Sequence, residues 1–470
     1  MTTLRFHGSA AVLLLPLALF VAVTARLFIS EAAFDLTGLA AAGVLTLFSG
    51  SLLAKAPSEY WKAAVRGASS ELTGTVVLIL IASGIFSAMM KASGVADGLV
   101  FLGGMLHLTG HAFTVFVLLA SSLMAAATGS SIGTLLAAMP IFFPAGVALG
   151  ADPAMLAGAV LSGAIFGDNL APVSDVTVIS SVTQRFRNGT PADIAGVVRT
   201  RLPYAMIALA VSLPVYAFMG ESLPVSEAAL SGDASALLML VPVAVLIAVA
   251  VRTRDVLMAI SAGVVTGTGL LIGRLSFATI FAADDGRLSG FLISGISNVS
   301  PIILLCVTLF AFTGIVREAG VPDMMAKALE AGSAGRPSAL RTELFLSAAT
   351  LVVTTLFAAV TSASVALVGS LTDDIGRASN VHPYRRSHIL SGLANSLPVL
   401  MPFSAFVLIT MAAVSGLEGA AAVTPFTLMT AAFYPIALFL VFGFMVLTGT
   451  GRMMETPEPE AAEAKTATAL

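Results

Sequence analysis

The chain has 470 residues, of which 57% are hydrophobic and 10% are charged, and its mean hydropathy is +0.99. Apolar stretches of roughly 18 or more residues recur along the chain, which excludes an ordinary soluble domain. The net charge of −3, with basic residues scattered at the ends of these stretches, gives no basis for a nucleic-acid partner. We therefore expect an all-α polytopic membrane protein, and its single cysteine, Cys306, excludes a disulfide within one chain.

Eight apolar stretches have the length and composition of single crossings. They run near 11–29, 36–54, 73–91, 202–219, 236–251, 256–273, 300–317 and 424–448. Two longer regions, 111–184 and 340–417, contain a Ser/Thr/Gly-rich interruption followed by a proline-bearing polar one, so neither can be a single helix.

In each longer region we expect a re-entrant hairpin followed by a crossing that is broken near the midplane. The hairpins are 113–148 and 343–380, with tips at 128–131 and 361–364, and the broken crossings are 154–184 and 386–417, with breaks at 167–172 and 395–402. The hairpin segments look too short on either side of their tips for two comfortable crossings. Unwound backbone inside a membrane must face protein or a watery cavity.

Segments of the first half recur in the second half. The segment 91–97 recurs at 317–323, Leu161-Ser162-Gly163 recurs at 390–392, and Pro172-Val173-Ser174 recurs at 402–404 as Pro-Phe-Ser. Lysine and arginine in short loops mark the cytoplasmic side. The residues used are Lys55, Lys62, Arg66, Arg185, Arg187, Arg199, Arg201, Arg252, Arg254, Lys327, Arg336, Arg341, Arg377, Arg385 and Arg386.

These marks place the two halves in opposite orientation. We expect two inverted-topology repeats of about five crossings each, 1–219 and 220–448, and a cytoplasmic acidic tail, 449–470. The N-terminus is also expected to be cytoplasmic, in a multi-pass protein of the cytoplasmic membrane.

Asp168 is the first candidate for an ion site, because a charged carboxylate near the bilayer centre costs roughly 3 kcal/mol and must pair, bind a cation or take up a proton. The alternative is that it caps a half-helix beginning near Leu170. The neutral oxygens of Asn169, Ser174 and Thr177, with carbonyls freed by a proline, suit Na⁺ or Li⁺. Asp175 is either a second carboxylate of the site or a neighbour that supports it.

Hydroxyls and amides at the expected tips and at the second break complete the candidate site. They are Thr128, Ser130, Ser131 and Thr134 at the first tip, Thr361, Ser362 and Ser364 at the second tip, and Asn395, Ser396 and Ser404 at the second break. Small residues between membrane helices also serve close packing. Because the second break carries no acid, we expect Asp168, with Asp175 as second candidate, to be the only buried titrating centre, and its counterpart to be neutral lining.

Other polar residues are expected to lie outside the site. Asp373 and Asp374 beside Arg377 are interpreted as a solvated group, and His107, His111, His382 and His388 as interfacial residues. No nucleotide-binding or zinc signature occurs, so no cofactor is expected. An intramembrane aspartyl protease is disfavoured, because seven residues across a proline break give Asp168 and Asp175 no reason to meet.

The run 161–177, L-S-G-A-I-F-G-D-N-L-A-P-V-S-D-V-T, resembles the S-G-A-x-F-G-D-K-x-S-P-x-S-D-T-T signature of NhaC-type sodium/proton antiporters. Thr128 to Thr134 resembles that family's hairpin tip, and His382-Pro383, Ser387 and Pro402-Phe403-Ser404 are similar to its later motifs. The resemblance covers about 73–448. Asn169 stands where the family has lysine, Val176 replaces the first paired threonine, and Ser391-Gly392 lacks an acidic pair.

The resemblance implies the fold of the ion transporter superfamily and assigns ion-linked roles to Asp168 and Asp175. The leading hypothesis is a Na⁺/H⁺ antiporter, not an enzyme, in which Asp168 binds Na⁺ (or Li⁺) and H⁺ in turn. The alternative is a Na⁺- or H⁺-coupled transporter or exchanger of organic anions or amino acids. The expected partners are the two ions and the lipid bilayer, and a second copy of the chain is a candidate partner in a homodimer.

Overall fold

The computed structural model of the chain describes residues 4–7, 10–27, 36–172, 174–221, 223, 225, 234–253, 255–274, 279–284, 287–320 and 338–455. Within these ranges the chain is helical apart from one antiparallel pair, β1 (Ala282–Asp284) and β2 (Arg287–Ser289). Helices satisfy every backbone polar group within one segment, which a membrane requires. The predicted all-α class is therefore confirmed. Several sequence-based assignments, including Lys327 and Arg336 and most of the acidic tail, lie outside the described residues.

The first half of the chain forms the helices of the first predicted repeat. They are η1 (Ala10–Leu13), α1 (Leu14–Ala25), α2 (Leu36–Leu53), α3 (Pro57–Ala68), α4 (Glu71–Ala92), α5 (Val95–Met105), α6 (Gly110–Thr128), α7 (Ser131–Ala148), α8 (Pro153–Leu170), α9 (Asp175–Val182) and α10 (Ile194–Phe218).

The second half follows a similar order. Its elements are η4 (Ala234–Met239), α11 (Leu240–Thr253), α12 (Val256–Arg274), α13 (Phe291–Glu318), α15 (Ala339–Leu356), α16 (Thr361–Ala378), α17 (Pro383–Ala394), η6 (Leu397–Leu400), α18 (Ala405–Val414), η7 (Ala420–Ala422), α19 (Pro425–Ala431) and α20 (Phe433–Thr448). Among the described residues, seven helices are long and apolar enough to cross a membrane, and up to nine if each bent pair counts as one span.

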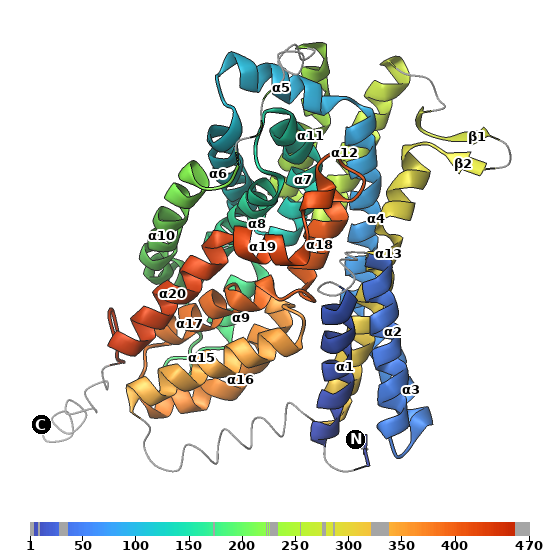
Figure 1. Cartoon of the computed structure of the whole chain (residues 1–470). Helices are drawn as coiled ribbons and strands as arrows, with labels where there is room; N and C mark the ends of the chain where they lie inside the picture. The colour runs from blue at the N-terminus through green and yellow to red at the C-terminus, as the bar shows by residue number, and fades with distance from the viewer. Residues whose placement is uncertain are drawn as a thin grey trace, which may run out of the picture.

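Two helix pairs occupy the predicted hairpin positions. The helices α6 and α7 meet at Gly129, whose positive φ of 69° suits glycine, and α15 and α16 meet at 357–360, where Ala358 and Ala359 also have positive φ. The second tip therefore precedes Thr361, which begins α16. Helix length does not decide whether the pairs turn back, because α6, α7 and α15 are each long enough to cross. Figure 1 shows α6 and α7 in the upper half of the molecule and α15 and α16 at its lower end, as inverted repeats would place them.

Helix breaks occur in both stretches that were predicted to be broken crossings. The first is interrupted between α8 and α9, and the second passes from α17 through η6 to α18 with a bend of 52°. A third break was not predicted: the stretch 424–448 bends by 54° between α19 and α20. Pro435 has no N–H to donate to the carbonyl of Ala431, which instead accepts from the hydroxyl of Tyr216 at 2.7 Å. The stretch 424–448, predicted as a crossing, is therefore bent at this point.

Glycines in α8 bring the first broken crossing close to the hairpin. A Cβ at Gly163 or Gly167 would collide with the backbone of α6, at Leu118 and Ser122. Small residues four apart on one face let two helices approach backbone to backbone in a membrane. This contact places the last turn of α8 beside the tip between α6 and α7.

The helices α4 and α13 form a long pair beside these elements (Figure 1). They cross at Gly84 and Gly295, where a Cβ on Gly84 would come within 2.5 Å of the carbonyl oxygen of Gly295. Cys306, in α13, is 3% exposed, as expected for a packing residue. Because α4 and α13 hold the equivalent places in the two predicted repeats, their close crossing supports the duplication, which stays a prediction.

Candidate functional site

Asp168 lies in the last turn of α8, immediately before the break. Its side chain is 5% exposed, and its Oδ2 accepts a hydrogen bond from Ser131 Oγ at 3.1 Å. The break begins at Ala171, somewhat later than predicted, and α9 begins at Asp175 with Ser174 at its N-cap. Asp168 therefore does not cap a half-helix near Leu170, and its carboxylate is available to bind a proton or a cation.

Neutral oxygens without partners surround this carboxylate. Ser174 lies beside Asp168, and its hydroxyl has no hydrogen-bond partner in the described part of the chain. The amide of Asn169 donates to the hydroxyl of Tyr434 at 3.2 Å, while its Oδ1 accepts nothing from the described residues. A buried polar oxygen without a donor is costly unless something else occupies it. A small hard cation is one such occupant.

Of the four polar residues at the first tip, only Ser131 hydrogen-bonds to Asp168 in the structure. Ser130 is the N-cap of α7 and accepts from the N–H of Gly133 at 3.1 Å. Thr128 and Thr134 lie with their hydroxyl oxygens 3.4 Å apart and line a small apolar cavity beside α11 and α12. These three residues belong to the tip but, unlike Ser131, they make no hydrogen bond to Asp168 in the described structure.

The two remaining candidates of the first break differ in burial. Asp175 is exposed, so it does not share a buried dyad with Asp168, although its charge acts on that carboxylate. Thr177 is buried and accepts a hydrogen bond from Nη2 of Arg201 at 2.7 Å. Within the described ranges, no cluster of three or more His, Cys, Asp or Glu residues could hold a metal ion.

The candidates of the second half mostly use their hydroxyls locally. Ser396 donates to the carbonyl of Leu393, Ser404 to that of Val399, and Ser364 to that of Val360. Thr361 is 8% exposed and Ser362 is half-buried at the start of α16. Asn395 differs, because it is 1% exposed and neither its Nδ2 nor its Oδ1 has a partner among the described residues.

Sequence reasoning missed Arg201 and Tyr434. Arg201 was assigned to a cytoplasmic loop, but α10 begins earlier than predicted and buries this side chain completely. Its Nη1 donates to Ser391 Oγ, so it joins α9 of the first broken crossing to α17 of the second. Tyr434 reaches Asn169 because of the bend before α20. A proline inside the predicted last crossing was the available signal for that bend.

Buried charges also occur in the second half, so Asp168 is not the only buried titrating group. Glu343 is fully buried between Arg385, at 2.9 Å, and Arg452, at 3.0 Å. Asp373 pairs with Arg386 at 2.8 Å and is 7% exposed, so its assignment as a solvated group is wrong. His388 is also buried, at 1% exposed. Arg385 and Arg386, assigned to a loop, are instead part of α17.

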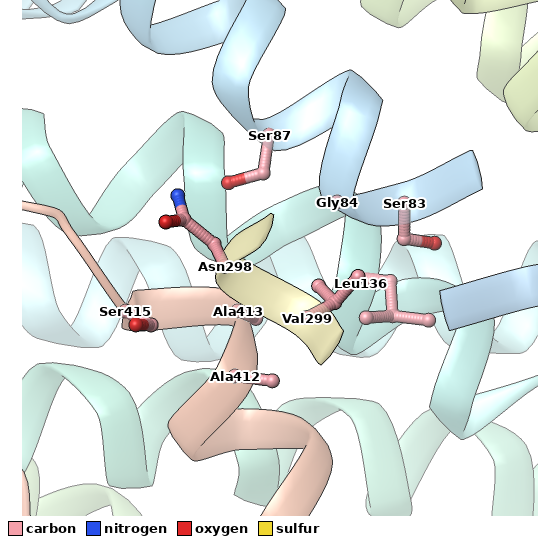
Figure 2. Close-up of a pocket in the computed structure, with 9 residues that line it drawn as sticks. All are labelled: Ser83, Gly84, Ser87, Leu136, Asn298, Val299, Ala412, Ala413 and Ser415. Atoms are coloured by element: carbon pink, nitrogen blue, oxygen red, sulfur yellow. The ribbon is translucent and has the colours of Figure 1, made fainter. Parts of the chain in front are cut away.

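A second polar feature lies between the long helices and α18. A small cavity of about 10 Å³ lies there. Its lining residues include Ser87 of α4, Asn298 of α13 and Ser415 at the end of α18 (Figure 2). The hydroxyl of Ser83, which also lines it, is buried without a partner in the described structure. The space is about that of one water molecule. None of its lining residues belongs to the predicted ion site.

Comparisons with known proteins agree with the resemblance found in the sequence. Residues 3–221 match the model of the Na⁺/H⁺ antiporter family. The chain is 33% identical over 158 residues to the malate-2H⁺/Na⁺-lactate antiporter of Bacillus subtilis, covering 34% of this chain and 32% of that protein. It is 40% identical over 104 residues to the Na⁺/H⁺ antiporter NhaC of Alkalihalophilus pseudofirmus, covering 22% of each. The resemblance identified in the sequence is thereby confirmed.

These alignments span a third or less of the two curated relatives. Among solved structures, the YdaH transporter of Alcanivorax borkumensis aligns over 83% of this chain and 88% of its own, with 13% identity and a TM-score of 0.40. The family match and the apolar helices together make the chain a multi-pass membrane protein.

Proposed function

We propose that the chain, whose residues 3–221 belong to the Na⁺/H⁺ antiporter family, is a secondary transporter that exchanges Na⁺ or Li⁺ for H⁺. The observation that carries the proposal is Asp168: a buried carboxylate at a helix break, with one hydroxyl donor, Ser131, and unpartnered oxygens on Asn169 and Ser174. One carboxylate with this surrounding binds either a proton or a small cation, and each excludes the other. A site that faces the two sides of the membrane in turn, and that holds either Na⁺ or H⁺ but never both, exchanges one ion for the other.

Each residue then has a distinct part in binding. Asp168 supplies the charge, and Ser174 and Asn169 supply neutral oxygens to a dehydrated cation. Ser131, from the hairpin tip, orients the carboxylate and links its occupancy to the hairpin. We assign the carrier role to Asp168 and place Asp175 at the rim, since Asp175 is exposed.

The proposed orientation puts the chain in the cytoplasmic membrane with both termini cytoplasmic. Lys62 and Arg66 are exposed residues of the amphipathic α3, and α3 lies at the lower end of the molecule in Figure 1. The beginning of α1 lies at this same end. Short basic segments remain on the cytoplasmic side of a membrane, which supports this assignment.

The test is Na⁺-driven proton flux into proteoliposomes, followed with a pH-sensitive dye. We expect Asp168→Asn to lower the initial rate by at least about 100-fold, because the amide keeps the shape of the side chain but neither titrates nor neutralises a cation. Asp175→Asn, a matched loss of an exposed acid, should retain most of the rate. Undiminished flux in Asp168→Asn vesicles would contradict the proposal.

A second candidate is coupled exchange of organic anions. It is favoured by Arg201, a buried guanidinium with no carboxylate partner among the described residues, since guanidinium groups bind carboxylates well. The malate/lactate relative points the same way. Uptake of labelled malate and lactate, with and without a Na⁺ gradient, separates this function from cation exchange.

A further inference from the structure

Arg201 is an unusual buried charge in this molecule. Its side chain is fully buried in α10, and its two terminal nitrogens donate to hydroxyls, those of Thr177 and Ser391. Its Nε has no partner in the described part of the chain. The other two fully buried arginines among the described residues, Arg385 and Arg386, each pair with a carboxylate. The positive charge of Arg201 is therefore not neutralised by a direct ion pair within the described structure.

The position of Arg201 ties it to the ion site. Thr177 belongs to α9, which follows the break at Asp168, and Ser391 belongs to α17 of the second broken crossing. The guanidinium acts through its charge on Asp168. It is a fixed cation next to the site where the transported cation would bind.

We infer that Arg201 is a positioning residue that sets the Na⁺ affinity of Asp168. When no cation is bound, Arg201 balances part of the negative charge of Asp168. The free energy of Na⁺ binding is therefore less favourable than it would be at an isolated carboxylate. A fixed unit charge near the site in a protein interior changes such binding by at least about tenfold. Weaker binding allows faster release, since affinity differences act mainly on dissociation.

The hydroxyl partners explain how the charge stays in place. A carboxylate partner would neutralise Arg201 and remove its effect on Asp168, whereas hydroxyls hold the guanidinium without cancelling its charge. Because the two hydroxyls belong to different broken crossings, a relative movement of these crossings changes the distance from Arg201 to Asp168. The affinity for Na⁺ is then coupled to the conformation of the transporter.

The inference rests on the proposed Na⁺ exchange, and the test is initial-rate uptake of labelled Na⁺ into proteoliposomes. The Na⁺ side is held at a fixed alkaline pH, so that protons do not compete with Na⁺ for Asp168, and the other side is acidic. Arg201→Gln should lower the KM for Na⁺ about tenfold and lower the maximal rate, because Na⁺ binds more tightly and leaves more slowly. Arg201→Lys, which keeps the charge, should return the KM to within about twofold of the wild type. Arg199→Gln, which removes an exposed arginine of the same helix, is the matched control.

An unchanged or increased KM in Arg201→Gln, or failure of Arg201→Lys to restore it, overturns the inference. A residue that only supported the fold would lower the amount of active protein without lowering the KM. If Arg201→Gln does not fold, Arg201→Met, with a long unbranched side chain, takes its place in the same assay. Loss of exchange in Asp168→Asn with an unaltered KM in Arg201→Gln would refute this inference alone, whereas active Asp168→Asn would refute the proposed function.

Discussion

The two broken crossings share an architecture but use their polar groups differently. At the first break, backbone groups bond to one another: the N–H of Ala171 donates to the carbonyl of Gly167, and the N–H of Ser174 donates to the carbonyl of Ala171. The hydroxyl of Ser174 has no partner in the described part of the chain. At the second break Ser396 and Ser404 donate to backbone carbonyls of their own segment. The hydroxyl of Ser174 is therefore available for the ion-binding role that we propose, whereas those of Ser396 and Ser404 serve the backbone.

Charge divides the two crossings in the same way. Asp168 at the first break has a single hydroxyl donor, whereas the buried arginines of α17 are held by Glu343 and Asp373. Paired charges fix a structure, and an incompletely paired charge leaves room for a ligand. The first crossing is thus suited to ion binding and the second to holding the surrounding elements in place.

Among the variants that test this difference between the two crossings, Glu343→Gln is expected to have the largest effect. The substitution leaves Arg385 and Arg452 without their shared carboxylate, and breaking a buried ion pair costs about 3–5 kcal/mol. The midpoint of thermal unfolding in detergent should fall clearly, and exchange should fall with the amount of folded protein. Glu59→Gln, which breaks an exposed pair with Lys62, should leave the midpoint nearly unchanged. Equal unfolding midpoints for Glu343→Gln and Glu59→Gln would contradict the claim that the ion pairs of Glu343 stabilise the fold.

Ser131→Ala is expected to have a smaller and more specific effect. It removes the hydrogen bond by which Ser131 orients the carboxylate of Asp168. Losing this orientation, at about 1.5 kcal/mol for a hydrogen bond to a charged group, should raise the KM for Na⁺ roughly tenfold. Ser396→Ala is the counterpart in the second crossing and should leave the KM unchanged, since its hydroxyl serves a local carbonyl. Uptake of labelled Na⁺ gives both values. Similar changes of the KM for Na⁺ in Ser131→Ala and Ser396→Ala would contradict the claim that only the first crossing binds the ion.

The smallest effect is expected from Asp175→Asn. The side chain is exposed, so solvent screens its charge, and losing that charge should raise the KM for Na⁺ by less than about threefold. The same uptake assay measures it. A loss of exchange as large as that of Asp168→Asn would place Asp175 in the site itself, contrary to its exposure.

The sequence was sufficient to locate the breaks and the first candidate acid. Proline and glycine next to Asp168, in an apolar run, leave few alternatives to a broken crossing. Which tip hydroxyl faces the acid was not predictable, because Ser130 and Ser131 are neighbours and only the start of α7 determines that Ser130 caps and Ser131 points to Asp168.

Arg201 and Glu343 were not predictable as buried groups for a different reason. A basic residue near the end of an apolar run is usually cytoplasmic, and this rule assigned Arg201 to a loop. Burial depended on partners distant in sequence, Ser391 for Arg201 and Arg385 for Glu343. Such pairings follow from tertiary packing and leave no local pattern.

Equilibrium binding of labelled Na⁺ to the purified protein in detergent, at alkaline pH, tests the central role of Asp168 most directly. We expect saturable binding to the wild type and to Ser396→Ala, and none above background for Asp168→Asn. Binding by Asp168→Asn with the affinity and capacity of the wild type would contradict the account.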